Sequence, residues 1–87
     1  MAIPDDAKRR AAERAVELVA DGHIVGLGTG STSRFAIEAL GRLVAAGKSI
    51  QGVATSEATA QMARGLGISV LDLNDVSEID LTIDGAD

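Results

Sequence analysis

Cysteine is absent from the 87 residues, and Phe35 is the only aromatic residue. The chain therefore offers neither a disulfide nor a thiolate nucleophile, and it has no aromatic platform on which nucleic-acid bases could stack. His23 is the only imidazole, which argues against a histidine-based zinc site. The formal net charge of -5 disfavours nucleic acid as a partner, because lysine and arginine must neutralise its phosphates. A small anion is not excluded, because backbone amides bind phosphate without a net positive charge.

Long hydrophobic runs are also missing. No apolar stretch approaches the roughly 20 residues of a membrane span, and charged side chains interrupt residues 1–20, where a signal peptide would need an apolar region. We therefore expect a cytoplasmic protein with no membrane partner. Hydrophobic residues nevertheless make up 46% of the chain, which is too many for a disordered segment. The length allows one domain at most.

The spacing of apolar residues predicts helices that alternate with short strands. Helical spacing indicates helices over about residues 5–20, from the glycine-rich stretch to about 46, and from 57 to about 66. Gly47 and Gly67 are expected to end the second and third helices, and Ser56 to cap the start of the third. Short apolar runs predict strands at 24–27, 50–54, 68–71 and 81–83, with a polar loop over 72–78.

This alternation is typical of α/β proteins with Rossmann-like βαβ units and a parallel sheet. A parallel strand that is buried on both faces is not expected to be the last element of a finished domain. The fourth strand has only four residues after it. We therefore interpret residues 1–87 as part of one α/β domain that is truncated after the fourth strand.

Polar segments follow the strands at the edge where open parallel sheets bind ligands. The first, Gly28 to Thr32, opens a helix, so its glycines and the helix amides suit a phosphate. A tight turn with a serine cap explains the same residues equally well. A serine stands where the dinucleotide-binding fingerprint needs its last glycine, and no Gly-Lys-Ser/Thr follows as in a Walker motif.

Two further segments complete this predicted edge. Asp84 and Asp87 flank Gly85 and Ala86, and their carboxylates suit sugar hydroxyls, a cation or acid–base catalysis. A polar turn is the simpler alternative, and we find no further carboxylate spaced as a metal ligand, so no metal is expected. The segment 55–57 is most simply a turn and a helix cap, although its place after the second strand also makes Ser56 a candidate substrate contact.

Three motifs together resemble a known family. GLGTGST at residues 26–32, TSEAT at 55–59 and LTIDGAD at 81–87 are similar, in order and spacing, to the first three signature segments of type A ribose-5-phosphate isomerase. LGI at 66–68 and DLN at 72–74 also resemble that family. Each motif alone is common, but the combination is highly specific and covers the chain from about residue 8 to residue 87.

The resemblance implies an isomerase/coenzyme A transferase-like fold and the interconversion of ribose 5-phosphate and ribulose 5-phosphate. The family works in the non-oxidative pentose phosphate pathway, without metal or organic cofactor, through an enediolate. By the match, Asp84 and Asp87 lie beside the sugar, where one assists ring opening and hydroxyl proton transfer. The candidate catalytic residues are therefore Asp84 and Asp87. The candidate substrate-binding residues are Gly28, Thr29, Gly30, Ser31, Thr32, Ser56, Asp84, Gly85, Ala86 and Asp87.

The family also has features without a counterpart in these 87 residues. A Lys-Gly-Gly-Gly segment follows the second aspartate, and a catalytic glutamate follows that segment. The lysine stabilises the enediolate, and the glutamate moves the carbon-bound proton. Family members have a second small domain, so we expect a homodimer or homotetramer when the protein is complete, and an inactive chain when it is not.

Two other functions fit the same pattern. Sugar-phosphate sensor domains of some transcription regulators share the general fold and bind without turnover. A coenzyme A transferase or a sugar-phosphate deaminase is a third alternative, against which the Asp84 to Asp87 motif argues. A downstream lysine and glutamate would favour the isomerase, and a winged-helix segment would favour the regulator.

Overall fold

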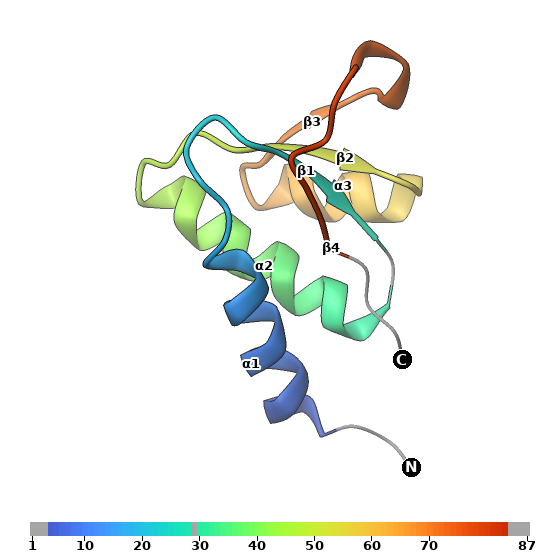
Figure 1. The fold of residues 1–87 in the computed structure, drawn as a ribbon. Helices are drawn as coiled ribbons and strands as arrows, with labels where there is room; N and C mark the ends of the chain where they lie inside the picture. The colour runs from blue at the N-terminus through green and yellow to red at the C-terminus, as the bar shows by residue number, and fades with distance from the viewer. Residues whose placement is uncertain (1–3, 29, 84–87) are drawn as a thin grey trace.

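A computed structural model describes residues 4–28 and 30–83. Helices and strands alternate along the chain, as the sequence predicts (Figure 1). The helices are α1 (Asp5–Val16), α2 (Ser31–Ala45) and α3 (Glu57–Gly65). The strands are β1 (Ile24–Leu27), β2 (Gln51–Ala54), β3 (Ser69–Leu71) and β4 (Leu81–Ile83), with a short 3-10 turn, η1 (Leu73–Asp75), inside the loop expected over 72–78.

The four strands form one sheet in the order β3-β2-β1-β4, and every neighbouring pair is parallel. Leu27 at the end of β1 is paired with Ala54 of β2 on one side and with Ile83 of β4 on the other. The predicted α/β class and parallel sheet are therefore confirmed. The ends of β1, β2 and β4 lie next to one another at the carboxyl edge of the sheet.

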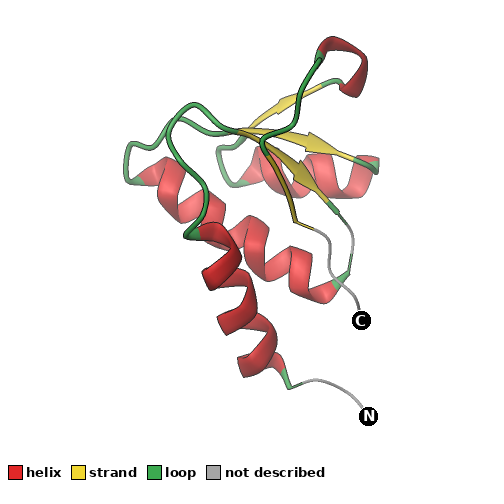
Figure 2. Ribbon diagram, viewed as in Figure 1, coloured by secondary structure: helices red, strands yellow, loops and turns green. Residues whose placement is uncertain are grey.

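The three helices gather on one face of the sheet (Figure 2). The buried core on this face joins β1 to α2, and it contains Val25, Leu27, Ile37 and Leu40. The opposite face is crossed by the connection between β3 and β4, which carries the exposed side chains of Leu73 and Ile79. Each face of the sheet is thus approached by a different kind of structure: helices on one side and a loop on the other.

Glycines end α2 and α3 in the way the sequence predicts. Gly47 has φ 104° and Gly67 has φ 84°, a region that side chains disfavour. The amides after α2 turn back onto the helix, with Gly47 N donating to the Val44 carbonyl at 3.0 Å and Lys48 N to the Leu43 carbonyl at 3.0 Å. This is a Schellman motif, and the amides of Gly67 and Ile68 repeat it at the end of α3.

The first helix is shorter than the sequence predicts, because it ends at Val16 and not near residue 20. The amides of Leu18 and Val19 bond three residues back, to Ala15 and Val16, so the chain tightens out of the α-helix. This turn buries the side chain of Val19 and leaves that of Leu18 exposed. The predicted end of α1 was wrong because the helical spacing of apolar residues continues to Val19, although the backbone has already left the α-helix in this turn.

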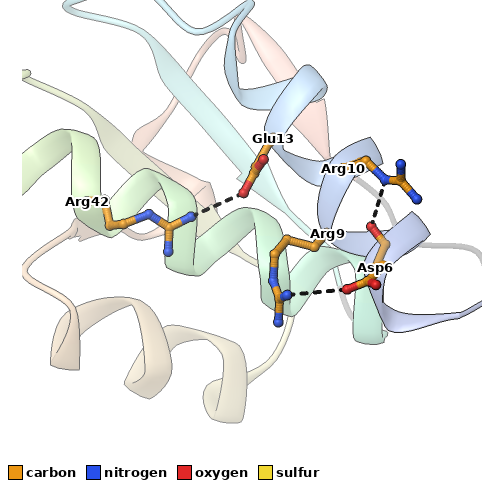
Figure 3. Close-up of polar contacts among 5 residues, drawn as sticks. All are labelled: Asp6, Arg9, Arg10, Glu13 and Arg42. Carbon is orange, nitrogen blue, oxygen red and sulfur yellow. Dashed lines mark hydrogen bonds and ion pairs between the residues drawn. The ribbon is translucent and has the colours of Figure 1, made fainter.

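Helix α1 packs along α2, and charged side chains border their contact (Figure 3). The Oε1 of Glu13 in α1 lies 3.8 Å from the Nη2 of Arg42 in α2, and within α1 the Nη1 of Arg9 lies 3.7 Å from the Oδ1 of Asp6. The Arg9 guanidinium also lies over the ring of Phe35, 5.1 Å from its centre. Both ion pairs are exposed, so each contributes little stability, and burial of apolar residues such as Ala12 dominates the contact.

None of the helices within residues 4–28 and 30–83 has the length and apolar character needed to cross a membrane.

Candidate functional site

The carboxyl edge of the sheet brings two of the predicted site segments together. The Gly28 amide donates a hydrogen bond of 2.8 Å to the carbonyl of Ile83. This bond extends the pairing of β1 with β4 to the last described residue of β4. The start of the glycine-rich segment therefore lies beside the end of β4.

Gly30 sets the start of α2. Its backbone has φ 99° and ψ 167°, a combination that is essentially restricted to glycine. The helix begins at the next residue, Ser31, and the Arg34 amide closes the first turn on the Gly30 carbonyl at 3.1 Å. The first amides of a helix have no partner within the helix and carry partial positive charge. As Gly30 has no side chain to cap them, this helix start is suited to an anion.

Lys8 is a candidate site residue that the sequence did not reveal. Its Nζ donates a hydrogen bond of 2.6 Å to the Oγ of Ser31, and the pair is half-buried. The contact places an ammonium, with three N–H donors, beside the first turn of α2. A sequence signal was available, because Lys8 precedes the buried residues Ala12 and Val16 at intervals of four and therefore shares their face of α1.

A cleft of about 360 Å³ opens between the starts of α2 and α3. Four of the predicted substrate-binding residues line it: Gly28, Gly30, Ser31 and Ser56. Arg34 also lines the cleft, and its guanidinium lies 5.5 Å from the centre of the Phe35 ring. Thr32 follows in the first turn of α2 and is half-buried. The fold thus gathers residues from two loops that are well separated in the sequence.

Ser56 is the N-cap of α3, as predicted. Its Oγ accepts a hydrogen bond of 3.2 Å from the Thr59 amide and donates one of 2.9 Å to the Thr59 Oγ1. Glu57 follows in the first turn of α3, where a carboxylate suits the positive end of the helix dipole, and its Oε1 lies 3.4 Å from the Arg64 Nη1. The contact of Ser56 with substrate remains a prediction.

Several candidates lie outside the described residues. These are Thr29, Asp84, Gly85, Ala86 and Asp87. Within the described ranges no group of three histidine or acidic side chains is arranged as metal ligands would be. His23 has a structural role, because its Nδ1 accepts a hydrogen bond of 3.0 Å from the Ala20 amide in the turn before β1.

The sequence profile of the family described as ribose 5-phosphate isomerase A (phosphoriboisomerase A) matches residues 51–87. A ribose-5-phosphate isomerase A of Listeria monocytogenes is 58% identical over 80 residues, which are 92% of this chain and 36% of the relative. The chain belongs to the ribose 5-phosphate isomerase A family. It spans little more than a third of the length of the curated relatives that it matches.

Solved structures of the family share this fold. The ribose 5-phosphate isomerase A of Neisseria gonorrhoeae superposes with a TM-score of 0.86 at 45% identity. The match covers 100% of this chain and 38% of the Neisseria chain. A D-ribose-5-phosphate isomerase in complex with phospho-erythronic acid gives a TM-score of 0.91 at 35% identity, and covers 99% of this chain with 38% of its own. Family membership therefore agrees with the motifs over residues 26–32, 55–59 and 81–87.

Proposed function

We propose that a longer protein carrying this chain interconverts ribose 5-phosphate and ribulose 5-phosphate through an enediolate, in the non-oxidative pentose phosphate pathway. We further propose that the protein needs neither a metal nor an organic cofactor, that it is cytoplasmic, and that it forms a homodimer or homotetramer. It is supported by the names of the family relatives and by the structure at the start of α2. The 87 residues supply part of the site, and we expect them to be inactive alone.

The observation that carries this proposal is the contact of Lys8 with Ser31 at the start of α2. Three features that favour an anion meet there: the helix dipole, the side-chain-free backbone at Gly30, and the Lys8 ammonium. A phosphate monoester has the charge and oxygen atoms that such a site binds. The complex of one family structure with phospho-erythronic acid shows that this relative accepts a phosphorylated sugar acid.

The remaining roles come from the family resemblance. Asp84 follows Ile83 directly in the sequence, and the Ile83 carbonyl is bonded to the amide of Gly28. We therefore infer that the phosphate binds at the start of α2 and that the sugar extends toward the end of β4. In this arrangement Asp84 and Asp87 act on the sugar hydroxyls, and a lysine and a glutamate of the longer protein act on the enediolate and the carbon-bound proton.

The proposal is tested in a chimera in which residues 1–87 replace the matching segment of the Neisseria gonorrhoeae relative. We expect this chimera to isomerise ribose 5-phosphate in the presence of a chelator, while the 87-residue chain does not. Replacing Lys8 with Met should raise the KM about tenfold or more, because a charge-assisted hydrogen bond typically contributes about 1.5–3 kcal/mol.

Lys48 provides a matched control. It is also half-buried, and its Nζ donates to the Val19 carbonyl at 3.4 Å, away from the cleft. Lys48→Met should therefore leave the KM unchanged within about twofold, as expected for a side chain that does not touch substrate. An equal rise in both variants would remove Lys8 from the site. Binding of ribose 5-phosphate by a folded chimera without turnover would favour the sensor interpretation over the isomerase.

A further inference from the structure

Asp80, directly before β4, makes two hydrogen bonds to a single residue of β1. Its amide donates to the Ile24 carbonyl at 2.8 Å, and its Oδ2 accepts from the Ile24 amide at 2.8 Å. Asp80 therefore bonds both the amide and the carbonyl of Ile24, from which it is separated by 56 positions in the sequence.

The carboxylate of Asp80 stands where a backbone carbonyl would be in a longer strand. The pairing of Val25 with Leu81 places Ile24 opposite Asp80 when it is continued by one residue. In a regular parallel ladder the Ile24 amide would then bond the carbonyl of the residue before Asp80. Because β4 begins at Leu81, the side chain of Asp80 supplies that acceptor.

The apolar pattern of this segment does not define a single register. Ile79, Leu81 and Ile83 alternate with polar residues, so a two-residue shift that brought Ile79 opposite Val25 would keep an apolar side chain at each position that faces the core. Such a shift would move the end of the strand by about 6.5 Å. The backbone bonds of the ladder would look the same in both registers, because they do not depend on side-chain identity.

Two contacts distinguish the observed register. Thr82 lies opposite Gly26, where an added Cβ would come within 3.0 Å of the Thr82 Oγ1, so the fit depends on the glycine. The Asp80 carboxylate is the one hydrogen-bonding side chain among the described residues that joins the two strands. Moving β4 by two residues would take this carboxylate away from the Ile24 amide.

We propose that Asp80 is a positioning residue, which fixes the register of β4 on β1 and so determines where the chain leaves the sheet after Ile83. The catalytic consequence rests on the proposed function, in which the residues after Ile83 act on the sugar. Gly30, Ser31 and Lys8 lie on elements other than β4, so the start of α2 depends less on the register of β4 than the residues after Ile83 do. Loss of Asp80 should therefore impair turnover more than phosphate binding.

The test compares Asp80→Ala and Asp80→Asn in the chimera with a matched control, Asp21→Ala. Asp21 also uses a side-chain oxygen to bond a backbone amide at the amino edge of the sheet, that of Ser49 at 2.6 Å, but it does not touch β4. We expect Asp80→Ala to lower kcat at least about tenfold, because small misplacements of reacting groups have effects of this size. The inhibition constant of inorganic phosphate should stay within about twofold in all three variants.

The asparagine variant separates the positioning role of Asp80 from the effect of its charge. Asparagine keeps an oxygen acceptor for the Ile24 amide, so Asp80→Asn should keep kcat within about threefold of the unchanged chimera. Asp21→Ala should also keep it within about threefold, although both alanine variants lose a similar bond. An unchanged kcat in Asp80→Ala, or an equal fall in Asp80→Asn, would overturn the assignment.

Amide hydrogen exchange keeps this inference separate from the proposed function. The Gly28 amide is bonded to Ile83 at the far end of β4, so its exchange should become faster in Asp80→Ala and not in Asp80→Asn or Asp21→Ala. If the unchanged chimera is folded but inactive, the proposed function fails, and this measurement alone decides the role of Asp80. Unchanged Gly28 protection in Asp80→Ala would overturn the role, whether or not the chimera is active.

Discussion

Helices α2 and α3 begin at similar places in the fold, but their amino-terminal ends are capped differently. Each starts at the carboxyl end of a strand, and together they line one cleft. The start of α2 has a glycine N-cap at φ 99° and a lysine from another helix bonded to its first residue. The start of α3 has Ser56, whose hydroxyl bonds the amide and the hydroxyl of Thr59 in its own first turn.

This difference favours the start of α2 over the start of α3 as the proposed ligand-binding site. The Ser56 hydroxyl proton is directed at Thr59, so a phosphate would have to replace a bond that already stabilises the helix. Gly30 makes no such bond and allows close approach of a ligand to the backbone. Two segments that each lead from a strand into a helix, Gly30-Ser31-Thr32 and Thr55-Ser56-Glu57, are therefore expected to differ in function.

The largest expected effect is on substrate affinity. Replacing Ser31 and Thr32 together with alanine in the chimera should raise the KM about 10²-fold, since two hydrogen bonds to a charged ligand each contribute about 1.5–3 kcal/mol. Steady-state kinetics with ribose 5-phosphate measures it. The matching pair at α3, Ser56→Ala with Thr59→Ala, should change the KM less than about threefold. Similar KM values for the two double variants would show that both helix starts contact substrate.

Gly30→Ala tests the backbone at the first helix start. At φ 99° a Cβ introduces strain of about 1–3 kcal/mol, so we expect the free energy of unfolding in urea to fall by that amount. Substrate affinity should fall as well, because relieving the strain moves the first turn of α2. A variant with unchanged stability and KM would contradict the special conformation at Gly30.

Gly41→Ala tests how the two helices are held together. An added Cβ at Gly41 would lie 2.9 Å from the Leu66 Cβ, an atom that cannot move without its backbone. Overpacking of this kind typically lowers the free energy of unfolding by about 1–3 kcal/mol, which urea titration would show. Gly65→Ala is the control, because an added Cβ there meets nothing within 4 Å. Equal stability of the two variants would contradict the close packing of α2 against the end of α3.

Ser56→Ala is expected to have the smallest effect. Loss of an N-cap hydroxyl typically lowers stability by about 1 kcal/mol, and the KM should not change beyond twofold or so if Ser56 acts only on its own helix. Thermal unfolding and kinetics of the same preparation would separate the two roles. A large rise in KM with little change in stability would return Ser56 to the substrate-binding set.

Much of the fold was predictable because its signals are local. Gly47 and Gly67 marked helix ends, because the residue after a helix often has a positive φ, which favours glycine at that position. Ser56 was identified as a cap for the same reason. The end of α1 was not predictable from apolar spacing, because Val19 stays buried after the chain has left the helix.

The candidate site was predictable only in part. The sequence placed Gly28, Gly30, Ser31 and Ser56 at one edge of the sheet, and the structure shows that these four residues line the same cleft. Lys8 was missed, although its spacing from Ala12 and Val16 places it on the packed face of α1. Spacing shows which face of a helix is buried, but not which loop that face meets.

The sequence by itself determined the alternation of helices and strands, the glycine-marked ends of α2 and α3, and the family. These depend on backbone preferences and contacts between residues close in sequence, which the residue types specify directly. Only the tertiary structure decided that Lys8 reaches Ser31 and that Asp80 holds Ile24, across 23 and 56 positions. Such contacts depend on how α1 packs on α2 and on which register β4 adopts, and an alternating apolar pattern is compatible with more than one register.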